Sequence, residues 1–195
     1  TFVLRCLFMK IMPQIINAGF YDAEVVHGSV HATKPRKVSV YEFEYIIENG
    51  GVSHIENGEY PIKTDCVICA KPEQIRHTEL PYKCLYIHAI IEDEELKENL
   101  RAVPDFYYPT EPDKIKSYFT ALISELKIPK PNNNLNASII FLEILSCLFN
   151  EQTQKNGKSI NSDKNMKIID KALKYIDENF TENIILNDIA KHVHF

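Results

Sequence analysis

The most reactive side chains of this sequence are five cysteines, of which Cys66 and Cys69 form a C-x-x-C motif. Such a pair can bind a metal ion when both thiolates converge on one point. The residues around the motif, 65–69, have the pattern of a β-strand, and residues three apart on a strand point to opposite faces. No second C-x-x-C completes a site, so a structural role is predicted for both thiols. Scattered cysteines in odd number, without a secretion signal, fit a reducing cytoplasm.

A second group of side chains could bind a small molecule. Alternate residues from Tyr82 to His88 share one face of a strand-like segment, and that face is expected to point into the interior of a β-structure. An apolar interior with a few converging polar groups is the general form of a small-molecule site. The side chains predicted to line it include Tyr45, Arg76, Thr78, Tyr86 and His88. The alternative is that Tyr45, Tyr86 and His88 are core residues with satisfied polar groups.

The strands that must position these side chains are short and regularly spaced. In the segment 38–47, Phe43 and Tyr45 alternate with Glu42 and Glu44, which places the aromatic and acidic residues on opposite faces. Turns rich in Gly and Asn separate further predicted strands at 52–55, 59–63, 66–70 and 83–91. This pattern indicates an antiparallel, closed or nearly closed barrel, so the predicted fold class is mainly β with α.

The hydrophobic period becomes helical after about residue 92. A short helix is predicted to end before Pro104, and Asp113 is predicted to cap a longer one. The next helix, 135–152, is apolar around most of its circumference and must be covered on two sides. We expect a second subunit to cover one side, although complete burial within one protomer is the alternative. The residues predicted to form this dimer contact are Ile139, Leu142, Leu145 and Phe149.

The last part of the chain is predicted to be a separate helical region. Residues 150–165 contain a single aliphatic residue, Ile160, and have the composition of a flexible linker. A helix follows that Ser162 or Asp163 can cap, and a second helix starts near Leu186. The apolar opening, residues 2–9, lacks a small-residue cleavage site and is expected to be a strand or arm rather than a signal peptide.

Two C-terminal segments, IDKALKYIDENF at 169–180 and ILNDIAKHV at 185–193, closely resemble the start of the DNA-binding domain of AraC/XylS-family transcriptional regulators. Three earlier segments look like the cupin sensor domains of that family, namely YEFEYII at 41–47, DCVICAKPEQIR at 65–76 and YKCLYIH at 82–88. The resemblance covers nearly the whole chain. One departure is Glu73, where family members often have Gly.

The resemblance implies a domain order and a set of partners. It implies a cupin-like effector-binding barrel at 1–112, a helical dimerisation unit at 113–152, a linker at 153–166 and the truncated start of a helix-turn-helix domain at 167–195. It places Arg36 in the pocket near the barrel mouth, where a guanidinium suits hydroxyls or a carboxylate. The expected partners are a small effector such as a sugar, a second copy of the chain and, through a longer protein, DNA.

The charge of the chain bounds what these residues alone can bind. The formal net charge is −5 and no dense cluster of Lys and Arg occurs, which argues against nucleic-acid binding by this fragment alone. The longest apolar run, 137–149, contains Glu143 and is too short to span a bilayer. A cytoplasmic protein without membrane contact is therefore expected.

A metal-dependent cupin enzyme is the main alternative function. The P-x-x-x-x-H half of the cupin motifs is present in Pro72 and His77, but the H-x-H positions fall near Arg36, where no plausible ligands occur. His27 and His31 have helical spacing in a segment that is predicted to be strand or loop. No nucleophile–base pair or phosphate-binding loop is visible, so no enzyme activity, metal or cofactor is predicted. A third possibility is a dimerisation module whose interior is simply packed.

Overall fold

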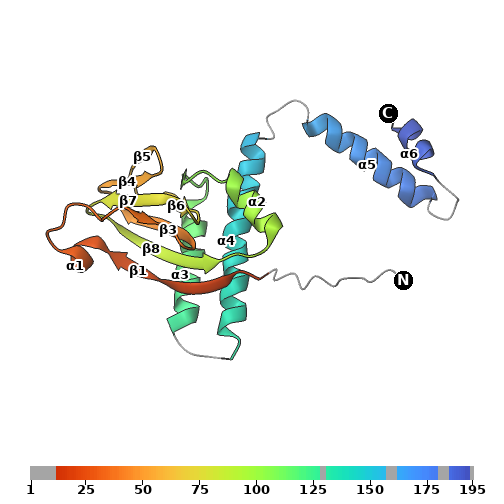
Figure 1. Cartoon of the computed structure of the whole chain (residues 1–195). Coiled ribbons are helices and arrows are strands. Elements are labelled where there is room, and N and C mark those ends of the chain that lie inside the picture. The colour runs from red at the N-terminus through yellow and green to blue at the C-terminus, as the bar shows by residue number, and fades with distance from the viewer. Residues whose placement is uncertain (1–11, 128–130, 157–161, 180–184, 194–195) are drawn as a thin grey trace, which may run out of the picture. The chain divides into compact units, whose positions relative to one another are not determined.

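Nine strands and six helices form within the residues that the computed structural model describes, 12–127, 131–156, 162–179 and 185–193 (Figure 1). These residues belong to two compact units that divide between Glu151 and Gln152. The predicted N-terminal strand or arm at 2–9 lies outside the described residues. The elements that begin in the first unit are, in order, β1 (Gln14–Asp22), α1 (Ala23–His27), β2 (Arg36–Lys37), β3 (Tyr41–Glu48), β4 (Val52–Ile55), β5 (Gly58–Pro61), β6 (Val67–Ala70), β7 (Ile75–Glu79), β8 (Lys83–Ile90), α2 (Glu94–Ala102), β9 (Phe106–Tyr107), α3 (Pro112–Lys127) and α4 (Asn133–Asn156), the last of which continues past the division.

The strands form two antiparallel sheets. The first sheet has the order β1-β8-β3-β6-β9 and the second the order β2-β7-β4-β5. The predicted strands at 52–55, 59–63, 66–70 and 83–91 correspond to β4, β5, β6 and β8 within one or two residues at most ends. In the described part of the chain the strand pairing does not close into a barrel, and the fold is a mixed α and β structure.

Strand β3 separates the two apolar regions of the first unit. Phe43 and Tyr45 belong to one buried cluster together with helix residues, whereas Ile46 belongs to another that contains residues of both sheets, such as Ile55 and Cys84. Because side chains alternate across a strand, each face of β3 serves a different layer. The second cluster therefore lies between the sheets, and the first lies between the five-stranded sheet and the helices.

Helices α3 and α4 cover the outer face of the five-stranded sheet. The ring of Phe141 meets that of Phe43 edge-on with centroids 5.2 Å apart, and Phe119 lies 5.9 Å from Tyr45. Helix α4 buries one face against this layer, and the hydroxyl of Ser138 donates a hydrogen bond of 3.1 Å to the carbonyl oxygen of Pro13, directly before β1. The fully buried side chains of α4 include Ala137, Phe141, Ile144, Leu145 and Leu148.

The burial of α4 corrects one predicted dimer residue. Leu145 is 1 % exposed inside its own protomer, so it is not available to a second subunit. Leu142 and Phe149 are partly buried against the same core, whereas Ile139 is 50 % exposed. The sequence of a helix that is apolar all round does not show which side the sheet will cover. The prediction therefore assigned Leu145 to the wrong side.

Three element boundaries also differ from the predictions. The segment of His27, predicted to be strand or loop, contains the one-turn helix α1, because the carboxylate of Asp22 accepts hydrogen bonds from the amides of Glu24 and Val25. Helix α3 starts at Pro112, so Asp113 lies in its first turn instead of capping it. The predicted linker is largely helical, because α4 continues to Asn156 and the next helix starts at Ser162.

The second unit consists of α5 (Ser162–Asn179) and α6 (Leu186–His192) in the part of the chain that is described. The rings of Tyr175 and His192 stack with centroids 4.5 Å apart and hold the two helices together. Ile169 and Leu173, on α5, remain about half exposed. Among the described residues, no helix has the length and apolar character needed to cross a membrane.

Candidate functional site

A cavity of about 610 Å³ lies between the two sheets and is the candidate site. Its walls come from β1, α1, β3, β7 and β8 and from the segment that leads into β2. This volume is in the range of pockets that hold small metabolites. The cavity therefore has the size and the mixed polar and aromatic lining of a ligand site.

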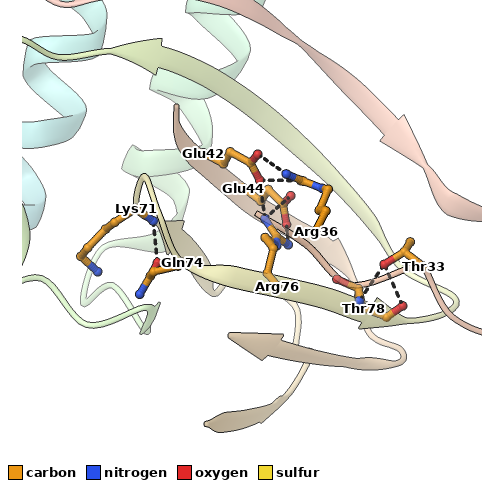
Figure 2. Close-up of polar contacts among 8 residues, drawn as sticks. All are labelled: Thr33, Arg36, Glu42, Glu44, Lys71, Gln74, Arg76 and Thr78. Atoms are coloured by element: carbon orange, nitrogen blue, oxygen red, sulfur yellow. Dashed lines mark hydrogen bonds and ion pairs between the residues drawn. The ribbon is translucent and has the colours of Figure 1, made fainter. Parts of the chain in front are cut away.

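Four charged side chains, here called the charge cluster, are joined by hydrogen bonds (Figure 2), and three of them, Arg36, Glu44 and Arg76, line the cavity, whereas Glu42 lies behind Arg36. Arg36 donates to both carboxylate oxygens of Glu42, over 2.6 Å from Nη1 and 2.7 Å from Nη2. Arg76 donates from Nη1 to Oε1 of Glu44 and from Nη2 to its Oε2, at 2.9 and 3.0 Å. Nη1 of Arg76 also lies 2.9 Å from Oε2 of Glu42, which joins the two pairs into one network.

Strand register brings the charge cluster together. Glu42 and Glu44 occupy alternate positions of β3 and face the space between the sheets. Arg36 of β2 and Arg76 of β7 are directly paired residues of the other sheet, and two adjacent guanidinium groups would repel each other without the carboxylates opposite. The side chains of Glu42, Glu44 and Arg76 are 4 %, 7 % and 3 % exposed, whereas that of Arg36 is 51 % exposed.

The pKa values of Glu42, Arg36 and Arg76 are shifted in the direction that favours their ionised forms. Burial disfavours the charged form of Glu42, but the hydrogen bonds from Arg36 and the charge of Arg76 outweigh it and lower the pKa of Glu42. Burial likewise opposes the charge of Arg76, but contact with Glu44 and Glu42 raises its pKa. The hydrogen bond to Glu42 raises the pKa of Arg36. Buried ions of this kind are tolerated because each is paired and hydrogen-bonded.

Two threonines that line the cavity, Thr33 and Thr78, are hydrogen-bonded to each other (Figure 2). The hydroxyl of Thr33 accepts from the amide of Thr78 at 2.8 Å, and the amide of Thr33 donates to the carbonyl of Thr78 at 2.9 Å. At the other end of β7, the carbonyl oxygen of the Gln74 side chain accepts from the amide of Lys71 at 2.6 Å. These contacts fix both ends of the strand that carries Arg76.

Aromatic side chains line much of the rest of the cavity. The rings of Tyr21 and Tyr82 lie 5.3 Å apart, and Tyr86 lies 5.1 Å from the ring of His88. Phe20 also contacts the cavity. Burial lowers the pKa of His88, although the nearby Glu42 opposes this effect, so the ring is mostly neutral at pH 7. The cavity lining thus combines charged and aromatic side chains.

The structure brings most of the predicted lining residues together. Arg36, Arg76, Thr78, Tyr86 and His88 all line the cavity. Tyr45 does not: it faces the helices, where its hydroxyl donates to Oδ1 of Asp65 at 2.6 Å, because odd positions of β3 point away from the space between the sheets. That expectation is corrected.

Two residues that the sequence prediction missed are central to the site. Glu42 and Glu44 lie on the strand face opposite Phe43 and Tyr45, as the alternation predicts, but the alternation does not predict their burial. Acidic residues at alternate strand positions are usually a solvated face. The available signal was the pair of predicted pocket arginines, which need buried anions as partners.

The cysteines and histidines that could bind a metal ion do not converge on one point in the residues described. Cys66 belongs to the cluster between the sheets and Cys69 to the one beneath the helices, so the two thiols lie on opposite faces as predicted. Burial raises the pKa of each to about 12. His54 and His77 stack with ring centroids 4.3 Å apart. In the residues described, no group of three or more His, Cys, Asp or Glu side chains is placed to hold a metal ion.

Comparison with known proteins adds no assignment. No protein-family model matches the chain, and no curated protein matches it significantly.

Proposed function

We propose that this chain is the effector-sensing and dimerisation part of an AraC-type DNA-binding transcriptional regulator, and that its cavity binds a small molecule. The observation that carries the proposal is the cavity of about 610 Å³ with Arg36, Glu44 and Arg76 of the charge cluster in its wall. Buried charges are costly to keep and are retained where they have a structural or functional use. A cupin-like sensor domain is the finer fold assignment that belongs to this proposal.

The chemistry of the cavity suits a sugar or a similar metabolite. Hydroxyl groups both donate and accept hydrogen bonds. The Arg36 guanidinium supplies donors near the mouth, and the Glu44 carboxylate supplies acceptors inside. The rings of Tyr21 and Tyr86 offer an apolar surface for the carbon skeleton.

The remaining elements supply the output of the sensor. Ile139 and Leu135 on α4 are each about half exposed and form an apolar surface suited to a second subunit. The sequence of α5 and α6 resembles the start of a helix-turn-helix domain, so we propose DNA binding for the domain that these helices would begin. To act as a switch, the ligand must bind two arrangements of the dimer with different affinity. A cytoplasmic location is part of this proposal.

Ligand binding can be tested before the effector is identified. A panel of sugars, amino sugars and small acids is screened by thermal shift, and hits are titrated by calorimetry. We expect a saturable hit whose affinity falls on the order of tenfold in Glu44→Gln, which keeps the shape of the side chain but removes its charge. Glu59→Gln, on the exposed surface of β5, is the matched control. A hit with equal affinity for both variants and the wild type would place the ligand elsewhere.

A further inference from the structure

The buried part of the charge cluster carries an excess of negative charge. Glu42, Glu44 and Arg76 are each more than nine-tenths buried and together contribute two negative charges and one positive charge. The charge that restores neutrality belongs to Arg36, which is 51 % exposed and reaches in from a strand of two residues. One buried carboxylate is thus neutralised by a side chain that stands at the cavity mouth.

We propose that the cavity binds an organic cation, a small metabolite with an ammonium, amidinium or guanidinium group, which contacts Glu44 and takes the place of Arg36 on Glu42. This inference rests on the proposed small-molecule site and names the ligand class of that site. The vacated Arg36 position offers two carboxylate oxygens that already accept hydrogen bonds from a guanidinium at 2.6 and 2.7 Å. A planar cation can form the same two bonds.

The aromatic wall favours the same ligand class. Phe20, Tyr21, Tyr82 and Tyr86 line the cavity that contains the charge cluster. The faces of aromatic rings carry partial negative charge and attract cations, most strongly where water is excluded. Carboxylates together with several aromatic rings therefore stabilise a cation twice, through charge and through the ring faces.

The other titratable groups of the cavity do not compensate the excess of buried negative charge. His88 is paired with Glu42 across β3 and β8, but burial lowers its pKa and keeps it mostly neutral at pH 7. Lys34 contacts the cavity from an exposed position, where water screens its charge. Both guanidinium groups already bond to carboxylates. An anionic ligand would meet Glu44 without a free buried cation among the described lining residues.

The experiment uses Arg36→Ala and a small cation as probe. The variant leaves Glu42 with the hydrogen bond from Arg76 and a vacated position at the mouth. We expect methylguanidinium to raise the melting temperature of Arg36→Ala saturably, with an apparent affinity on the order of tenfold higher than for the wild type, because the competing side chain is gone. N-methylurea, its uncharged analogue, and sodium chloride at equal concentration should have no such effect. Arg36→Ala/Glu42→Gln should lose the response.

Two results would overturn the inference. One is an equal response of the wild type, Arg36→Ala and the double variant to methylguanidinium. The other, which needs no variant, is wild-type protein that binds glucose or gluconate but not glucosamine at a pH where the amine is protonated. In that second case the sensor proposal stands and only the ligand class is wrong. Rescue by methylguanidinium without any binder in the metabolite panel would support the cation site and count against the sensor.

Discussion

The phenol ring of Tyr86 lies directly over Gly19, its paired residue on the neighbouring strand β1. A Cβ atom at position 19 would lie 3.1 Å from Oη of Tyr86 and 3.2 Å from its Cε1. Most real Cβ contacts are longer, so a side chain at this position would push the ring away from β1. Because Tyr86 lines the cavity, the absence of a side chain at Gly19 determines the position of this part of the cavity wall.

We expect the effect of Gly19→Ala on stability to depend on Tyr86. Alanine within a strand is favoured over glycine by about 0.5–1 kcal/mol, but here that gain is opposed by the displaced ring. The substitution should therefore be neutral or destabilising in the wild type and stabilising by about 0.5–1 kcal/mol in Tyr86→Ala. Urea unfolding of the four proteins of this double-mutant cycle measures the difference. Equal effects in both backgrounds would show that the ring does not rest on Gly19.

Glu73 adopts a left-handed backbone conformation with φ of 77° in the turn between β6 and β7. Such a conformation costs a residue with a side chain about 1 kcal/mol relative to glycine. Its ion pair with Lys37 joins two exposed side chains and contributes little. We expect Glu73→Gly to raise the free energy of unfolding by several tenths of a kcal/mol up to about 1 kcal/mol.

Glu56 provides the matched control for this turn, because it also has a positive φ, of 53°. Its carboxylate accepts a hydrogen bond of 2.7 Å from the amide of Ile75, which Glu73 does not do. Glu56→Gly should therefore raise the free energy of unfolding by less than Glu73→Gly does, or should lower it. Thermal and urea unfolding of the two variants measure the difference. The reverse order would mean that the turn at Glu73 is not strained.

The charge cluster makes stability depend on pH. The folded-state pKa of Glu42 is lowered, so its contribution is present above the pKa of the unfolded chain and is lost as pH falls through the folded value. In Arg36→Gln the hydrogen-bonded charge is absent and the pKa of Glu42 should rise. We expect the free energy of unfolding of the variant to be about 1 kcal/mol lower than that of the wild type at pH 7. This difference should disappear as the solution is acidified below about pH 4. Urea unfolding across this range measures the gap, and a pH-independent gap would contradict the prediction.

The exposed surface of α4 should form the dimer contact. Ile139 is half exposed, and a charged residue at this position would be buried without a partner when two subunits associate. We expect Ile139→Glu to shift a wild-type dimer to monomers in sedimentation equilibrium, with little change in monomer stability. Lys116→Glu, on the exposed side of α3, should leave the dimer intact. A wild-type protein that stays monomeric at all concentrations would remove dimerisation from the proposed function.

The elements of the fold were largely predictable because their signals are local. Period-two alternation located β3, and the turn at Asn57 and Gly58 located the β4–β5 pair. The short helix α1 was missed because its single signal is the cap at Asp22. The number of sheets was harder to predict. Strands close into a barrel only when particular edge strands pair, and no single segment of sequence determines that pairing.

The candidate site was predictable only in part for the same reason. Strand parity correctly placed Tyr86 and His88 in the cavity, but the same argument had no means of deciding which face of β3 the helices cover, and so misplaced Tyr45. The burial of Glu42 and Glu44 depends on Arg76, more than thirty residues later in the chain. Pairings between distant segments carry the chemistry of this site.

Strand β1 is a shared wall, since Asn17 and Tyr21 line the cavity while Pro13, just before the strand, is bonded to Ser138 of α4. The same strand therefore contributes to the wall of the candidate site and, through the residue before it, to the packing of α4. A substitution at Ser138 would remove the side-chain hydrogen bond that ties this end of β1 to the helix.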